Sequence, residues 1–224
     1  MSYLRLQWEV GSSNALRPPI YGRGNPLGSM TAEHLFTYPS MAMGFWVLLA
    51  LGIAIFSIIG FRYDREKGYA LSVYSLPYSK LEIFLGKLLS IFLLSVMALY
   101  IPILVIDIFP NVDTLHFIEA IILTRFYFNA LIFALYFVLF SIAISTLSSV
   151  VLQDMFLAFI ASFFLLVLPF FAGLDWPPFF FIFMIPKSLA GISPFEAFFL
   201  FWGLVAPIVL VLLSGLIFLR RDVL

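Results

Sequence analysis

The chain contains no cysteine among its 224 residues, which excludes disulfide bridges, thiolate metal sites and cysteine nucleophiles. Histidine is almost absent as well, and His34 and His116 lack the spacing of a metal-ligand pair. No Ser-His-Asp set and no pair of carboxylates on one expected face indicates a catalytic centre. We therefore expect no catalytic residues, no metal site and no cofactor bound by this chain.

Charge is also scarce. Charged residues make up 11% of the chain and hydrophobic residues 63%, whereas a soluble domain has about 25% and 45–50%. Such a chain needs lipid as the solvent for much of its surface. The formal net charge is zero, so nothing indicates a nucleic-acid partner.

Five long runs contain no Asp, Glu, Lys, Arg or His, and each is long enough to cross a hydrocarbon core of about 30 Å as a helix. These runs are residues 41–61, 88–106, 126–147, 155–174 and 197–219. Because lipid offers no partner for backbone groups, they are expected to be helices. The sequence thus predicts an all-α polytopic membrane protein with five transmembrane helices. Ion-coupled transporters keep charged groups at membrane depth, so the empty runs argue against a self-powered pump and favour an apolar or amphipathic substrate.

The placement of Lys and Arg predicts the orientation. Arg62, Arg65 and Lys67 follow the first run directly, and Arg220 and Arg221 follow the last. Basic residues close to a span favour the cytoplasmic side. The N-terminus is then outside and the C-terminus cytoplasmic, with residues 1–40 forming an extracytoplasmic tail.

Two short apolar pieces, 117–124 and 176–186, are too short to cross and are expected to form re-entrant or interfacial helices in the outer loops. The chain has 28 Phe residues, and many lie in the sequences WPPFFFIFMIP and FEAFFLFW. These aromatic residues are interpreted either as an interfacial belt or as a hydrophobic gate at the outer mouth of a pathway.

Residues 62–87 form a polar segment between the first two runs, with five basic side chains, Arg62, Arg65, Lys67, Lys80 and Lys87. Apolar anchors with charged flanks are typical of a helix that docks in a groove of a partner. The same composition also suits an ordinary interfacial helix whose charges face water and headgroups.

The order of residues in this segment favours the docking helix over the ordinary interfacial helix. The chain reads Arg65-Glu66-Lys67-Gly68-Tyr69, then Leu76-Pro77-Tyr78-Ser79-Lys80, then Leu85-Gly86-Lys87. This order and spacing resembles the cytoplasmic segment of ABC exporter permeases of the second type. The ending Phe218-Leu219-Arg220-Arg221-Asp222 is similar to the ending common in that family.

The resemblance implies a multi-pass permease subunit in the plasma membrane, which works as an export subunit of an ATP-driven ABC transporter. Cytoplasmic ABC ATPase subunits would be its partners, together with a second permease copy or a sister permease and the membrane lipid. ATP and Mg would bind to the ATPase. The segment 62–87 would be the cytoplasmic coupling segment. The residues implied at the ATPase interface are Arg65, Glu66, Gly68, Tyr69, Tyr74, Leu76, Pro77, Ser79, Lys80, Gly86 and Lys87.

The chain has no G-x-x-x-x-G-K-[ST] sequence, so it is not expected to be an enzyme. The family usually has a further span before a long outer loop, and here residues 1–40 stand in the place of that loop. A non-transporting structural or force-transmitting subunit therefore remains the alternative, with residues 1–40 reaching an extracytoplasmic partner. The substrate, its pathway and the choice between homodimer and heterodimer are left open by the sequence.

Overall fold

The computed structural model describes residues 43–68, 77–107, 125–188 and 192–220, and all regular structure within these ranges is helical. The long elements are α3 (Met43–Glu66), α5 (Lys80–Asp107), α7 (Arg125–Val151) and α12 (Ala206–Arg220). The shorter ones are α8 (Met155–Leu166), α9 (Leu168–Phe171), α10 (Phe179–Lys187), α11 (Ala197–Leu200) and the π-helix η3 (Phe201–Val205).

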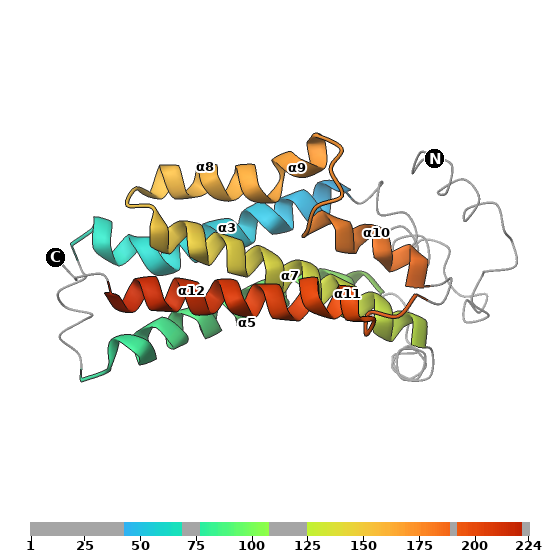
Figure 1. The fold of residues 1–224 in the computed structure, drawn as a ribbon, viewed down its shortest axis with the longest axis horizontal. Helices are drawn as coiled ribbons and strands as arrows, with labels where there is room; N and C mark the ends of the chain where they lie inside the picture. Colours follow the sequence, from blue (N-terminus) through green and yellow to red (C-terminus); the bar gives the residue numbers. More distant parts are fainter. Residues whose placement is uncertain (1–42, 69–76, 108–124, 189–191, 221–224) are drawn as a thin grey trace, which may run out of the picture.

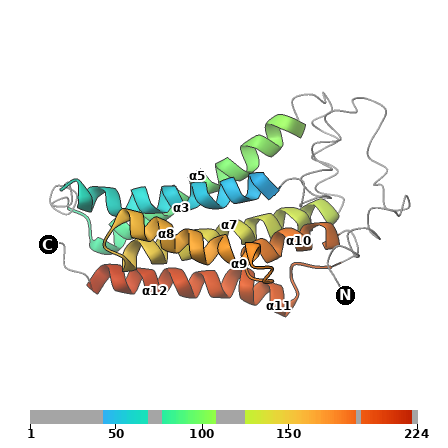
Figure 2. The ribbon, with the colours of Figure 1, turned by 90° about the horizontal axis from the view of Figure 1, so that it is seen from above.

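The helices form an elongated bundle around α7, as Figures 1 and 2 show. α7 lies between α3 and α12 and also contacts α5, α8 and α10. At one end of the bundle α3, α7 and α12 finish while α5 and α8 begin (Figure 1, left). We call this the junction end. It gathers segments that are far apart in the sequence.

Four helices are long and apolar enough to cross a membrane, judged by length and composition: 43–64, 80–101, 128–151 and 197–220. They correspond to four of the five expected runs. The remaining run, 155–174, was expected as a single transmembrane helix, but the structure gives α8 followed by the single turn α9, together Met155–Phe171. Val167 separates the two pieces, and Pro169 in the first turn of α9 has no backbone N–H to continue the ladder of α8. This shorter pair still runs antiparallel to α7 (Figure 1).

Two boundaries of the polar segment also differ from expectation. α3 does not stop at Phe61 but continues to Glu66, and α5 begins at Lys80 instead of residue 88. The extra turns are stable because their charged side chains find partners, as described below. Residues 62–66 and 80–87 are therefore helix ends, and only 67–79 connects them.

The expected short helix 176–186 is present as α10, which packs on α7 and buries Phe179, Phe181 and Ile182. The nearby Phe199 is also buried, whereas Phe195, Phe198 and Phe201 are exposed. The aromatic residues thus divide between a packed cluster and an outward-facing set. The expected short piece 117–124 and the tail 1–40 lie outside the described residues.

The last helix contains a local irregularity. α11, η3 and α12 follow one another without a break from Ala197 to Arg220, and η3 inserts one π turn. A Cβ on Gly203, in that turn, would lie 2.4 Å from ring atoms of Tyr136 on α7. Glycine is required there because the backbone of the π turn rests directly on the aromatic ring.

Large apolar side chains cover the outside of the bundle. Leu48, Phe156 and Leu212 are 71%, 69% and 61% exposed, and many other Leu, Ile and Phe residues are similarly exposed. Such a continuous apolar surface is not tolerated in water. Together with the four long apolar helices, it defines an all-helical, multi-pass membrane protein.

Candidate functional site

Charged side chains contact other helices at the junction end. Arg62, Asp64 and Glu66 leave the last turn of α3 and contact three different elements, α7, α5 and α8 respectively. We call these three residues, with Lys87 and Asp154, the charged junction. It lies directly beside both ends of the connection 67–79.

Arg62 is the buried member of the charged junction, with 3% of its surface exposed. Its Nε donates to the carbonyl oxygen of Ser149 at 2.5 Å, and its Nη2 donates to that of Val150 at 3.3 Å. These carbonyls belong to the last turn of α7, where the helix leaves its final C=O groups without internal partners. The cation also faces the negative end of the α7 dipole. Arg62 therefore caps α7 from α3.

Two carboxylates cap the start of α8. Glu66 accepts a hydrogen bond from the backbone N–H of Met155 at 2.7 Å. Asp154, the N-cap residue, accepts from the N–H of Leu157 at 2.9 Å. Negative charge at a helix N-terminus is favourable both as a cap and against the dipole. The first turn of α8 is thus held partly by its own cap and partly by α3.

An ion pair joins α3 to α5. Nζ of Lys87 lies 2.5 Å from Oδ2 of Asp64, and the two side chains are 17% and 26% exposed. Partial burial makes such a pair stronger than an exposed one, since less water screens it. The pair fixes the distance between the two helices that carry the connection 67–79.

The far end of that connection has its own cap. Ser79 Oγ accepts from the N–H of Glu82 at 3.2 Å, and Glu82 accepts from the N–H of Ser79 at 2.7 Å. This reciprocal arrangement is a capping box, which the sequence Ser-Lys-Leu-Glu encodes. At the other end, Gly68 has a φ of +76°, the left-handed conformation that terminates α3.

An aromatic trio supports the charged junction from within the bundle. Phe61, Phe84 and Phe218 come from α3, α5 and α12, and their ring centroids are 5.4–6.0 Å apart. All three rings are buried. Gly215 on α12 lies against Phe84, with room for little more than a hydrogen at its Cα. Charged contacts and ring packing together connect five helices at this end.

Some of the residues that the resemblance implies at the ATPase interface lie close together in the structure. Glu66 and Lys87 take part in the charged junction, and Ser79 forms the cap of α5. Gly68 and Pro77 lie in the connection 67–79, Lys80 is the first residue of α5, and Gly86 lies on an open face of α5. Arg65 lies on the last turn of α3, and its side chain is outside the described part. Tyr69, Tyr74 and Leu76 also lie outside the described residues.

Sequence reasoning missed the roles of Arg62, Asp64 and Asp154. Arg62 was counted as a cytoplasmic charge near the membrane surface, but the structure buries it. Its partners lie 87 and 88 residues away in the chain, so no local pattern could reveal them. Asp154 could have been found, because an Asp directly before an apolar helical run is a typical N-cap.

In the described part of the chain, no three His, Asp or Glu side chains come close enough to hold a metal ion. The charged junction bonds the last turn of α3 to α7, α5 and α8. Comparisons of the chain with known protein families, with curated proteins and with solved structures found no match. The resemblance to exporter permeases therefore stays a prediction from the sequence.

Proposed function

We propose that this chain is the membrane permease subunit of an ATP-driven exporter. In this proposal the connection 67–79 and the adjoining helix ends dock on a separate cytoplasmic ATPase, which binds ATP and Mg. A second copy or a sister permease completes the pathway for an apolar or amphipathic substrate. The chain lies in the plasma membrane, with its N-terminus outside and its C-terminus in the cytoplasm.

The observation that carries the proposal is the charged junction. A docking element can transmit force only if its ends are held firmly to the membrane helices. Arg62 and Glu66 hold one end to α7 and α8, the Asp64–Lys87 pair ties α5 to α3, and the Ser79–Glu82 capping box closes the first turn of α5. An interfacial helix that merely faced water would need none of these links.

The distribution of basic residues supports the proposed orientation. Along the described helices, six bases lie at the junction end and two, Arg125 and Lys187, near the other. The positive-inside rule then favours a cytoplasmic junction end. The six are Arg62, Arg65, Lys67, Lys80, Lys87 and Arg220.

The test is to purify the chain with its partners in mild detergent and to measure ATP hydrolysis by the complex in lipid nanodiscs. Deleting residues 72–79, or changing Glu66→Ala, is expected to remove the stimulation of the ATPase by the membrane subunit. Glu196→Ala is the matched control. Glu196 occupies the N-cap position of α11 at the opposite end, but its side chain makes no capping hydrogen bond. If the deletion leaves the complex assembled and fully active, docking through this segment is wrong.

The same preparation tests the alternative, a structural or force-transmitting subunit of a membrane complex. That function predicts that no ATPase co-purifies. It also predicts that removal of residues 1–40 dissociates the complex.

A further inference from the structure

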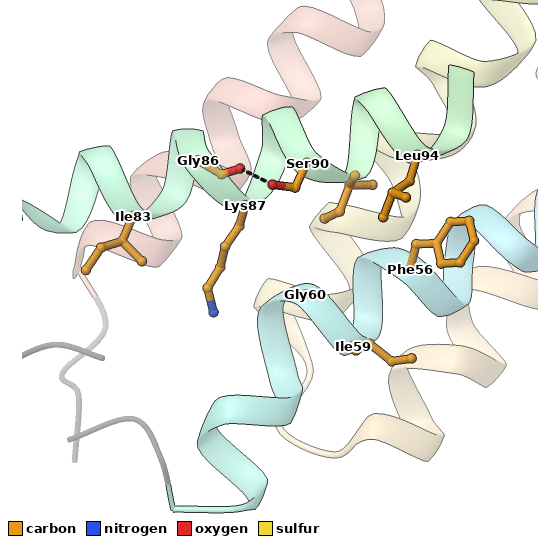
Figure 3. A pocket seen from close by; sticks show the side chains of 9 residues that line it. Phe56, Ile59, Gly60, Ile83, Gly86, Lys87, Ser90 and Leu94 are labelled. Atoms are coloured by element: carbon orange, nitrogen blue, oxygen red, sulfur yellow. Dashed lines mark hydrogen bonds between the residues drawn. The ribbon is translucent and has the colours of Figure 1, made fainter. Parts of the chain in front are cut away.

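A groove of about 420 Å³ runs between α3 and α5, beside the charged junction and open to the outside of the bundle. Figure 3 shows its two walls, with Phe56 and Ile59 on α3 and Leu94 on α5. Ile59 and Leu94 are each 49% exposed, so the groove faces the lipid. Its remaining lining is Gly60, Ile83, Gly86, Lys87, Ser90 and Ile91.

Two glycines shape this groove. A Cβ on Gly60 would lie 3.0 Å from the side chain of Ile91, so the two helices touch there. A Cβ on Gly86 would meet nothing within 4 Å. No side chain therefore covers α5 at Gly86. The space that a larger side chain would occupy there is part of the groove.

One end of the groove is charged. Figure 3 shows the Lys87 side chain pointing from α5 into the space between α5 and α3. Its ammonium bonds to Asp64, which is the last residue of the apolar stretch 43–64 of α3. The pair thus lies where the hydrocarbon gives way to the headgroup region. Ser90 donates its hydroxyl proton to the carbonyl of Gly86 at 2.9 Å, which leaves Lys87 as the donor for a ligand.

We infer that this groove binds a phospholipid with an anionic headgroup. One acyl chain lies along Phe56, Ile59 and Leu94, and the headgroup phosphate accepts a hydrogen bond from Lys87. An ammonium has three protons, and one bond to Asp64 leaves two for the phosphate. The apolar walls exclude a polar solute, and the single cation at headgroup depth favours a negative lipid over a zwitterionic one.

Asp64 limits the affinity of this site. Its carboxylate stands beside the same ammonium and repels a second anion. A lipid must therefore share Lys87, and removal of the carboxylate makes the cation fully available. Because of this competition, removal of the Asp64 carboxylate should strengthen lipid binding, whereas a purely structural ion pair would show no such effect. The inference needs only the membrane position of the helices and is independent of the proposed transport function.

The first experiment blocks the groove. The full chain is placed in nanodiscs of phosphatidylcholine that contain a trace of phosphatidylglycerol with a photoreactive acyl chain, and the labelled peptides are identified by mass spectrometry. We expect labelling at Phe56, Ile59 and Leu94, and its loss in Gly86→Leu, whose side chain has space to enter the groove. Gly52→Leu is the control, because a Cβ on Gly52 also meets nothing within 4 Å and Gly52 does not line the groove. Unchanged labelling in Gly86→Leu overturns the proposal.

The second experiment tests the headgroup. Labelling of the groove by phosphatidylglycerol is compared with labelling by a phosphatidylcholine that carries the same photoreactive chain. Because Asp64 already pairs with Lys87, the native protein should prefer phosphatidylglycerol by less than about fivefold, the ratio expected for one unpaired basic residue at the membrane surface. Lys87→Met should abolish this preference and Asp64→Asn should increase it, while both variants keep their melting temperatures within a few degrees. Equal labelling by the two lipids in the native protein, or equal effects of the two variants, contradicts the assignment.

Discussion

At the scale of single residues, Arg62 decides how α3 meets α7. A guanidinium presents its donors in a fixed planar fork, and here two of them reach two successive carbonyls at the end of α7. Both carbonyls belong to buried residues in the last turn of α7. Arg62 is therefore a structural cap at the base of the proposed docking element.

Replacing Arg62 tests this role. Arg62→Met keeps the bulk of the side chain but leaves the carbonyls of Ser149 and Val150 without these donors, which should cost about 2 kcal/mol in the free energy of unfolding. Arg220→Met is the control, since Arg220 is exposed at the same end of the bundle. The melting temperatures of both variants in detergent give the comparison. Equal stability of the two variants would show that the α7 cap contributes nothing.

Gly203 is the second residue on which the packing depends. In Gly203→Ala, the new methyl group would collide with the ring of Tyr136, at 2.4 Å. Overpacking of this kind costs about 1–3 kcal/mol. Gly52→Ala, which meets open space, should instead be neutral or slightly stabilising, because alanine favours the helix. Thermal unfolding of the two variants separates these effects, and partial recovery in Gly203→Ala with Tyr136→Leu would assign the loss to the collision.

At the scale of elements, four of the five expected runs are present as helices long and apolar enough to cross a membrane. Their physical cause is local, because a run without charge that is long enough to span lipid has to be helical. The ends of these helices were less predictable. α3 extends to Glu66 because its last turn is bonded to α7 and α8, and these partners are more than 80 residues away. The capping box Ser79–Glu82 indicates the start of α5 in the sequence. The expected boundary at residue 88 instead followed the start of the uncharged run.

The division of the run 155–174 into α8 and α9 was also not predictable from the local sequence. Composition alone cannot distinguish one span from α8 and α9, because every residue in the run is uncharged. The structure places Pro169 in the first turn of the separate short helix α9. The π turn at Gly203 has no marker in the sequence, and its contact partner Tyr136 lies 67 residues earlier in the chain.

The start of α8 gives the prediction at this scale. Asp154→Ala should speed amide hydrogen exchange at Leu157 about fivefold, since an N-cap contributes about 1 kcal/mol. Glu66→Ala should act on Met155 in the same way although it lies on another helix. Exchange measured by mass spectrometry in nanodiscs, with Glu196→Ala as the control, tests both. Protection of Met155 that is unaffected by Glu66→Ala would remove α8 from the charged junction.

At the scale of the whole molecule, the bundle has two unlike ends. The junction end combines buried charge, a capping box and an aromatic trio, which together connect five helices. The opposite end is built from short helices and clustered aromatic residues around α10 and η3. An arrangement of this kind suits a subunit that receives force at one end and transmits it along its helices.

The central claim is that the junction end docks an ATPase. Tyr78, in the connection 67–79, is 61% exposed, whereas Trp176, between α9 and α10, is 43% exposed. A photo-crosslinking amino acid placed at each position in turn, in cells, is the most direct test. The account predicts that Tyr78 captures a protein whose sequence contains the G-x-x-x-x-G-K-[ST] motif and that Trp176 does not. Capture of no such protein at Tyr78, or equal capture at both positions, would contradict the account.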